Sequence, residues 1–154
     1  MQLDTQFSVF LVNKPGVLAQ VTESIAKAKI NIQALSMMDS SEHGVLRFVC
    51  DDKDKAREVL KKNNNDFTET EVLVLTLPNQ PGSLASLARK LSEAHVNIAY
   101  AYTSGGAAGG KTTCIFKVAD AKKATKVVEG LNGSQKGTTK RRQAKIRPTP
   151  AARR

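Results

Sequence analysis

The chain has 154 residues, of which 40% are hydrophobic and 5% aromatic, and this length holds one ordinary domain or two very small ones. The formal net charge is +10, but residues 130–154 carry eight basic residues and no acidic one, so the excess belongs to a C-terminal tail and not to a basic domain. No run approaches the roughly 18 apolar residues of a membrane-spanning helix, and the N-terminus has no signal-peptide pattern, so the sequence predicts a cytoplasmic protein without a membrane partner.

Cysteine and histidine usage argues against a metal site. Cys50 and Cys114 lie in apolar, strand-like runs without C-x-x-C spacing, and His43 and His95 have no ligand-spaced partners. A zinc site needs three or four such side chains. We therefore expect buried, reduced thiols, no metal and no cofactor.

The first half of the chain is predicted to form one small α/β unit. A strand over residues 7–12 leads into Asn-Lys-Pro-Gly at residues 13–16. A helix follows, because Leu18, Val21 and Ile25 are spaced three and four apart and so share one face. A second strand begins at Asn31. The elements expected after it are a strand over residues 45–50, a helix around residues 56–60 and a short strand over residues 67–70.

The second half repeats this order. A strand over residues 72–77 leads into Asn-Gln-Pro-Gly at residues 79–82, and a helix with apolar Leu84, Leu87 and Leu91 follows. The elements expected after it are a strand beginning at Asn97, a strand over residues 113–118 and a helix around residues 124–128. A shift of 66 residues aligns 13–32 with 79–98 without a gap, whereas the third strand and second helix align at 68. Two extra residues must therefore lie in the second hairpin, which contains Gly-Gly-Ala-Ala-Gly-Gly.

The duplicated order predicts the fold. Strand–helix–strand–strand–helix–strand is the ferredoxin-like arrangement. We expect an α+β protein of two tandem ferredoxin-like βαββαβ units, each an antiparallel sheet with two helices on one face, over residues 1–70 and 71–135. A basic, disordered tail over residues 136–154 follows. The other sheet face, or the sheet edge, is expected to be free for a partner.

The sequence pattern does not clearly supply a fourth strand for the second unit. Only residues 138–146 follow the last helix at a suitable distance, and this segment has several charges and few strand formers. The edge of the second sheet is therefore expected to be open, or to be completed by another chain.

Residues 105–112, Gly-Gly-Ala-Ala-Gly-Gly-Lys-Thr, match the phosphate-binding pattern G-x-x-x-x-G-K-[ST]. That chemistry requires a helix after the loop, so that stacked N–H groups and the lysine surround the phosphates. The residues that follow are rich in β-branched and aromatic types and predict a strand. We therefore expect a hairpin loop and no nucleotide binding by Lys111 and Thr112.

The two N-x-P-G loops are the candidate binding elements. Each leads from a strand to a helix N-terminus, where unpaired N–H groups and a partial positive charge stabilise a carboxylate or phosphate. Gly16 and Gly82 have no Cβ, so a ligand can approach the backbone closely. Asn31 and Asn97 begin the second strands at the far end of each helix. They can meet an N-x-P-G loop only across an interface between units. The alternative interpretation is a tight turn without a ligand.

The motif resembles the ACT domain family. N-x-P-G followed by Leu-Ala and, about 15 residues on, by Asn-Ile is typical of that family, and it occurs twice here within residues 5–132. The tandem arrangement resembles stand-alone ACT proteins and the regulatory halves of aspartate kinases. The resemblance implies amino-acid binding between paired units, the loop N–H groups holding the carboxylate and the second strand orienting the amino group. The residues to which it gives this role are Asn13, Gly16, Val17, Leu18, Asn31, Ile32, Asn79, Gly82, Ser83, Leu84, Asn97 and Ile98.

Three classes of function are open at this point. The first is a regulatory amino-acid-binding module that forms a homodimer. Since no catalytic domain is found in this sequence, it would act on an enzyme in trans, or simply sense or buffer its ligand. The second is a protein that binds nucleic acid or an acidic partner through its tail, with contacts from Lys140, Arg141, Arg142, Lys145 and Arg147. RNA-recognition modules share the element order but need an aromatic-rich third strand, and here Phe48 and Phe116 stand alone. The third is an enzyme. The sequence contains no nucleophile–base pair and no paired carboxylates at a useful spacing, so we expect no catalytic activity.

Overall fold

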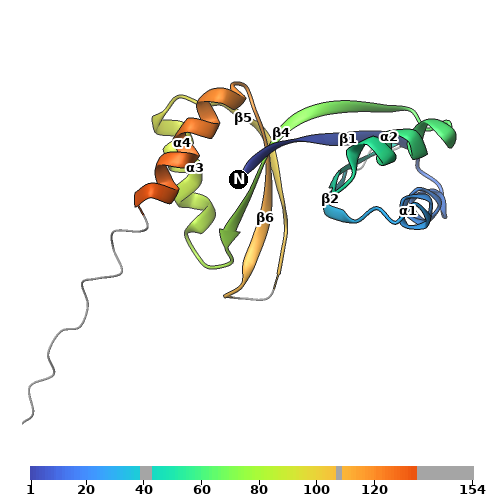
Figure 1. Cartoon of the computed structure of the whole chain (residues 1–154), viewed down its shortest axis with the longest axis horizontal. Helices are drawn as coiled ribbons and strands as arrows, with labels where there is room; N and C mark the ends of the chain where they lie inside the picture. Colours follow the sequence, from blue (N-terminus) through green and yellow to red (C-terminus); the bar gives the residue numbers. More distant parts are fainter. Residues whose placement is uncertain (39–42, 107–108, 135–154) are drawn as a thin grey trace, which may run out of the picture.

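The structure is a computed structural model that describes residues 1–38, 43–106 and 109–134. Within these residues, six strands form one antiparallel sheet in the order β2-β3-β1-β4-β6-β5, and four helices pack on it (Figure 1). The strands are β1 (Gln2–Val12), β2 (Ile32–Met38), β3 (His43–Cys50), β4 (Phe67–Pro78), β5 (Ile98–Ser104) and β6 (Lys111–Val118). The helices are α1 (Val17–Lys27), α2 (Lys53–Lys62), α3 (Ser83–Glu93) and α4 (Ala121–Ser134).

The two long strands at the centre of the sheet, β1 and β4, each pair with strands of both units. The C-terminal part of β1 pairs with β3, and its residues from Gln2 to Val9 pair with β4. In the same way the C-terminal part of β4 pairs with β6, and its residues from Phe67 to Val74 pair with β1. Each long strand is therefore the first strand of its own unit, and its N-terminal end occupies the fourth-strand position of the other unit.

The sequence prediction differs from the structure at both long strands. β1 begins five residues before residue 7, and β4 is one continuous strand where two strands, over 67–70 and 72–77, were expected. Only Glu71 separates the two expected strands, and it pairs with Thr5 of β1, so the strand continues through it.

The expected fold class is confirmed, with the helices of both units on one face of the sheet. Between this face and the helices lie two separate cores, one in each unit. The first includes Phe7 and Phe48 with α1 and α2, and the second includes Leu73 and Phe116 with α3 and α4. The hairpin between β5 and β6 is two residues longer than that between β2 and β3, as the change of offset predicted. In the part of the chain described, no helix is long and apolar enough to cross a membrane.

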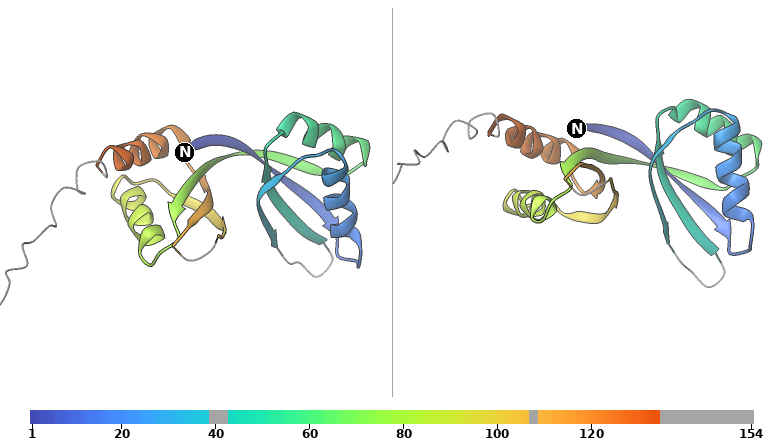
Figure 2. Two further views of the ribbon diagram at one scale, coloured as in Figure 1. Left: turned by 60° about the horizontal axis from the view of Figure 1, so that its bottom comes forward. Right: turned by 90° about the horizontal axis from the view of Figure 1, so that it is seen from below.

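The helix-free face of the sheet is not as free as expected. The sheet curves so strongly that β2 and β5, at opposite ends of the strand order, contact each other. A third core fills the space between the two halves, with Ala34 and Val49 from one side and Val72, Val74 and Ile115 from the other. The helices lie on the outside of this arrangement, α1 and α2 at one end and α3 and α4 at the other (Figure 2). The centre of the helix-free face is therefore occupied by contacts within the chain.

The fourth-strand position of the second unit is partly occupied by β1. Gln2 to Asp4 pair with Val74 to Val72, and the pairing extends no further along β4 among the described residues. Residues 138–146, which were considered for this position, lie outside the residues that the structure describes, as does the rest of the tail over 136–154.

Candidate functional site

The two N-x-P-G loops have the same backbone geometry. Gly16 and Gly82 both adopt left-handed φ angles, of 88° and 87°, and each is the residue that caps its helix. The hydrogen bonds also match, because Gln20 N–H donates to the Gly16 carbonyl and Ser86 N–H donates to the Gly82 carbonyl, both at 2.9 Å. The duplicated motif thus builds the same turn twice.

Each turn leaves a helix N-terminus without a side-chain cap. Neither α1 nor α3 has a capping hydrogen bond from a side chain or an acidic residue in its first turn. The helix begins directly after the glycine, so Pro15 and Pro81 precede the cap. The first N–H of each helix already donates within the loop, Val17 N–H to the Lys14 carbonyl at 3.4 Å and Ser83 N–H to the Gln80 carbonyl at 3.3 Å. The N–H groups that follow in the first turn, with the partial positive charge of the helix end, can donate to an anionic group.

The asparagines of the two loops lie in different surroundings. Asn13 is exposed. Asn79 is tied to the β5–β6 hairpin: its N–H donates to the Gly110 carbonyl at 2.8 Å, and its Nδ2 donates to the Gly106 carbonyl at 2.8 Å. In the second unit, the asparagine therefore fixes the neighbouring hairpin as well as the turn.

Asn31 and Asn97 use their main chains to hold the third strand of each unit. Asn31 N–H donates to the Asp51 carboxylate at 2.9 Å, and its carbonyl accepts from Asp51 N–H. The Asn97 carbonyl accepts from Ala119 N–H at 3.0 Å. Both residues are exposed, and each lies immediately before an edge strand, Asn31 before β2 and Asn97 before β5.

The predicted site residues are not brought together within one chain. The N-x-P-G loop and the second strand of a unit lie at opposite ends of a helix of 11 residues, which is about 16 Å long at about 1.5 Å per residue. In the second unit, Gly82 and Ser83 line a cavity of about 450 Å³, whereas Asn97 and Ile98 line a separate, more open hollow. The two units do not supply the missing halves to each other, since α1 and α3 lie at opposite ends of the molecule (Figure 1).

The sequence pattern placed Leu18 and Leu84 on the apolar faces of their helices. In the structure, these two residues are 38% and 48% exposed. The other apolar positions of α1 and α3, Val21, Ile25, Leu87 and Leu91, are buried as expected. The two exposed leucines lie in the first turn, beyond the edge of the core, and remain available to a partner or a ligand.

The glycine-rich hairpin does not have phosphate-binding geometry. Lys111 begins strand β6, so a strand and not a helix follows the loop. Thr112 is buried in that strand, opposite Leu77 of β4. Among the described residues, no group of histidine, cysteine or acidic side chains could hold a metal ion.

A buried polar cluster between the two units was missed by the sequence interpretation. Gln6 of β1 is fully buried, and its Nε2 donates to Ser8 Oγ at 3.1 Å and to the Tyr100 hydroxyl at 2.8 Å. The Tyr102 hydroxyl donates to Gln6 Oε1 at 3.1 Å, and burial raises the pKa of this hydroxyl well above its usual value. The Arg47 guanidinium lies 4.3 Å from the centre of the Tyr100 ring. The available signal in the sequence was the spacing of Tyr100 and Tyr102, because residues two apart on a strand share a face.

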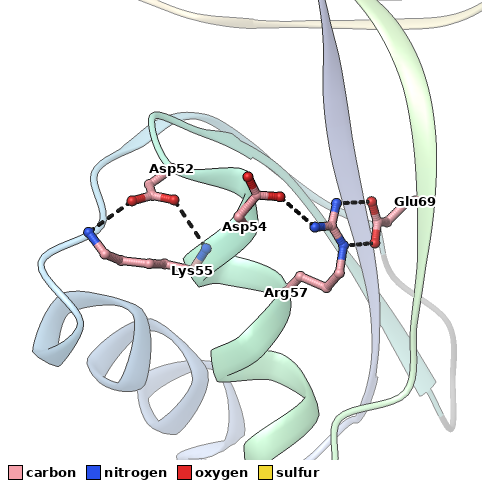
Figure 3. A network of polar contacts seen from close by, with 5 residues as sticks. All are labelled: Asp52, Asp54, Lys55, Arg57 and Glu69. Atoms are coloured by element: carbon pink, nitrogen blue, oxygen red, sulfur yellow. Dashed lines mark hydrogen bonds and ion pairs between the residues drawn. The ribbon is translucent and has the colours of Figure 1, made fainter.

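On the opposite face, ion pairs fix α2. Arg57 binds Glu69 of β4 through two hydrogen bonds, Nε to Oε1 at 2.6 Å and Nη2 to Oε2 at 2.7 Å, and also binds Asp54 (Figure 3). Asp52 caps α2 and pairs with Lys55. The network joins α2 to the part of β4 that lies in the first unit. Its carboxylates are all engaged, and its position away from the loops gives it a structural role.

A family model described as an ACT domain pair matches residues 1–134 of the chain. A solved structure from Bacteroides thetaiotaomicron is 33% identical in sequence, with a TM-score of 0.78, and the match covers 84% of this chain and 89% of the other. No curated protein matches.

Two more distant solved structures share the fold. The regulatory subunit of aspartate kinase from Thermus thermophilus, in a ligand-free form, is 16% identical with a TM-score of 0.62, and the match covers 84% of this chain and 94% of that one. Aspartokinase III of E. coli, in complex with lysine and aspartate, is 16% identical with a TM-score of 0.55, and the match covers 87% of this chain and 31% of that one.

Proposed function

The chain belongs to the ACT domain pair family, and from this premise we propose that it is a non-catalytic regulatory module that binds a free amino acid and acts on an enzyme in trans. The observation that carries the proposal is the repeated loop: two helix N-termini without a side-chain cap, each directly after a left-handed glycine, in the same geometry. The carboxylate of an amino acid can bind at such a helix end, because it accepts hydrogen bonds from main-chain N–H groups and is stabilised by the partial positive charge.

We further propose that the chain forms a homodimer through the edge strand β2. Its side chains Leu35 and Met37 are 38% and 45% exposed, and both lie on the helix side of the sheet, since their register partners Phe48 and Leu46 do. Exposed main-chain groups on an edge strand readily pair with another strand. Leu18, exposed on α1, adds to this apolar edge.

A β2-to-β2 dimer completes the site that one chain leaves divided. The N-x-P-G loop follows the end of β1 and lies at the same end of the sheet as Met38, because Val12 pairs with His43 and Met38 pairs with Val45. In an antiparallel pair of β2 strands, Met38 of one copy faces Ile32 of the other. The residues proposed to contact the ligand in this dimer are therefore Asn13, Gly16, Val17 and Leu18 of one copy with Asn31 and Ile32 of the second copy. The corresponding residues of the second unit are Asn79, Gly82, Ser83, Leu84, Asn97 and Ile98; its second strand is β5, at the other end of the strand order, so a β2-to-β2 pair does not by itself join them.

An action in trans on a metabolic enzyme is supported by the comparisons. The solved structures that share the fold include a separate regulatory subunit of an aspartate kinase. With both cysteines free and buried, we place this action in the cytoplasm.

A second candidate function is binding of nucleic acid or an acidic protein by the basic tail. The observation that favours it is the charge of residues 130–154, which carry eight basic and no acidic side chains. Such binding weakens steeply as salt increases, which distinguishes it from amino-acid binding.

A thermal-shift panel of the twenty amino acids on the full chain tests the main proposal. A ligand at about 100 times its dissociation constant stabilises the folded state by about 2.7 kcal/mol. We expect one or a few amino acids to raise the melting temperature and Mg-ATP to have no effect. A flat panel together with salt-sensitive binding of a nucleic acid would contradict the proposal and favour the second function.

A further inference from the structure

The basic run of the C-terminal tail begins inside the folded second unit. From Ala121, where α4 starts, to the end of the sequence there are eleven basic residues and one acidic residue, Glu129. Three of the basic residues, Lys122, Lys123 and Lys126, are exposed on α4. We call these three residues the α4 lysine patch. The folded part of the chain therefore carries the first part of the charge that the tail continues.

The counterpart helix of the first unit has acidic residues at two of these three positions. The repeat offset of 68 places Asp54 of α2 at the position of Lys122, and Glu58 at that of Lys126. Residues four apart lie on the same face of a helix, and all four of these residues are exposed. The charge of this outer face is therefore reversed, although the two helices occupy corresponding places in the repeat.

The charges of α2 hold its own unit together, whereas those of α4 do not. In α2, Asp54 and Arg57 belong to the network that joins the helix to Glu69 of β4 (Figure 3). At the position of Arg57, α4 has Thr125, whose hydroxyl donates to the Ala121 carbonyl of the same helix. None of the ion pairs between described residues involves α4. The α4 lysine patch is thus available to an external anion.

Two of the three lysines lie at the electrostatically unfavourable end of their helix. The N-terminus of a helix has a partial positive charge, so acidic residues stabilise the first turn and lysines do not. The first turn of α2 contains Asp54, whereas the first turn of α4 has no acidic residue and contains Lys122 and Lys123. The Asp120 carboxylate, just before α4, accepts from the Lys123 N–H at 2.9 Å. The lysine side chains therefore do not stabilise α4, which points to a role in binding.

We propose that the α4 lysine patch and the tail together bind the phosphate backbone of duplex DNA without reading its sequence. The inference rests on the second candidate function, binding of nucleic acid by the tail, and extends it to a surface of the folded unit. It does not depend on amino-acid binding. The tail has no acidic residue, so it adds to the charge of the patch instead of neutralising it. Because the tail follows α4 directly, DNA held by one is at high effective concentration for the other.

The chemistry of this surface selects duplex DNA among anionic partners. The apolar side of α4, with Ala124 and Val128, is buried in the core of the second unit, so it is not available to insert into a membrane. Protein partners are held mainly by large apolar or aromatic anchors, and residues 119–154 contain no aromatic residue. For the same reason there is no ring on which the bases of a single strand could stack. Lysines supply charge alone, and duplex DNA presents one negative charge per about 1.7 Å of its axis.

The salt dependence of DNA binding by the full chain tests the proposal. Fluorescence anisotropy with a labelled duplex of random sequence gives the association constant between about 50 and 200 mM salt, and each phosphate contact contributes about −0.9 to the slope of its logarithm against that of the salt concentration. The test variant is Lys122→Asp with Lys126→Glu, which introduces the residues that α2 has at these positions. We expect it to weaken binding about tenfold and to make the slope shallower by about 1.8, equivalent to two phosphate contacts.

A matched variant separates the patch from the net charge of the chain. Lys27→Glu with Lys61→Glu makes the same change of charge in the first unit, and the second unit has Glu93 and Glu129 at these positions. Both lysines are exposed, and α1 and α2 lie at the opposite end of the molecule from α4 (Figure 1). Salt screens charges that are far from the bound duplex. We therefore expect this variant to bind DNA with the affinity and the slope of the original chain.

The fold of the test variant is checked by its thermal unfolding. Lys122→Asp places an acid in the first turn of α4, as Asp54 does in α2, so the melting temperature should stay the same or rise while DNA binding weakens. A second variant, Lys122→Gln with Lys126→Gln, removes the two charges and keeps good helix-forming side chains. We expect it to give the same change of slope.

Three results would overturn the proposal. If both α4 variants kept the original slope while Arg141→Gln with Arg142→Gln lowered it, the tail alone would bind DNA, and the second candidate function would stand without the patch. If the full chain bound no duplex DNA even at about 50 mM salt, the second candidate function would fail as well. Tighter binding to a single strand, to duplex RNA or to phosphatidylserine vesicles than to duplex DNA would assign the surface to another partner.

Discussion

At the scale of single residues, the two loop glycines carry a conformational requirement that other residues meet poorly. Gly16 and Gly82 have φ angles near +88°, and a Cβ added at either would meet nothing within 4 Å. The cost of a substitution is therefore backbone strain and not a clash, about 1–2 kcal/mol for a left-handed L-residue. We expect Gly16→Ala and Gly82→Ala each to lower the free energy of unfolding by this amount in urea denaturation.

Gly105→Ala is the matched control for this prediction. Gly105 also has open space at its Cβ position but no positive φ. It should change stability by less than about 0.5 kcal/mol. Equal losses of stability at all three glycines would contradict the prediction, because the left-handed φ of Gly16 and Gly82 would then not be the cause of the loss.

The cysteines give a second prediction at the residue scale. Burial raises the pKa of the Cys50 thiol to about 11, and burial also raises that of Cys114. The thiolate is the reactive form, so we expect neither thiol to react with a disulfide reagent at pH 8 in the native protein and both to react in denaturant. Because the neutral thiol is favoured in the fold, its contribution to stability is lost as the pH rises above the unfolded value of 9.0 toward 11. Rapid labelling of native Cys50 at pH 8 would contradict the packing of its core.

At the scale of elements, α2 is fastened to the shared strand β4 by Arg57 and Glu69. The hydrogen bonds from Arg57 hold the pKa of Glu69 below its usual 4.5. A lowered carboxyl pKa stabilises the fold above the unfolded value and loses this effect as the pH falls through the folded one. We expect a double-mutant cycle of Arg57→Ala and Glu69→Ala to give a favourable coupling at pH 7 that declines as the pH falls below 4.5 and is lost as Glu69 becomes protonated in the folded state.

The exposed pair Lys55 and Asp52 serves as the comparison. Its lysine side chain is 62% exposed, whereas those of Arg57 and Glu69 are 30% and 32% exposed. The pair has one ionic contact and not a two-bond fork, so its coupling should be smaller. A larger coupling for this pair would contradict the role given to Arg57.

The sequence predicted the elements well because their signals are local. The helix faces of Val21 and Ile25, the turns at Gly16 and Gly82 and the hairpin with two extra residues all follow from spacing over a few positions. The strands predicted over 67–70 and 72–77 are separated only by Glu71, and their joining in one strand depends on the pairing of Glu71 with Thr5 of β1, which is not a local signal. Leu18 and Leu84 fit the helix periodicity but lie beyond the core, which only the packed structure defines.

At the scale of the whole molecule, the two units share strands, a buried polar cluster and a third core. Such sharing should make unfolding one cooperative event. Leu91 is fully buried in the second unit, and Leu91→Ala should cost about 2–5 kcal/mol. Unfolding of this variant is followed by the labelling of Cys50 in the first unit and of Cys114 in the second unit. We expect the unfolding midpoint to fall by the same amount with both probes. Separate midpoints for the two thiols would show that the units fold independently.

The candidate site was predictable only in part, and for the same reason. The loop that can hold a carboxylate is a local motif, so Gly82 and Ser83 could be found from the repeat. The apolar walls of the cavity come from β4, α3, α4 and the N-terminus, and no spacing in the sequence links Met1 to Val128. The second half of the predicted site, at Asn31 and Asn97, lies at the opposite end of each unit, and in our proposal it reaches a loop only across an interface between units.

The central claim is that the chain binds a free amino acid, and calorimetric titration of the full chain with each of the twenty amino acids tests it most directly. We predict a saturable heat for at least one amino acid, with a dissociation constant unchanged between 50 and about 200 mM salt, since no counterion release is involved. The absence of saturable binding for all twenty, at ligand concentrations up to about 10 mM, would contradict the claim.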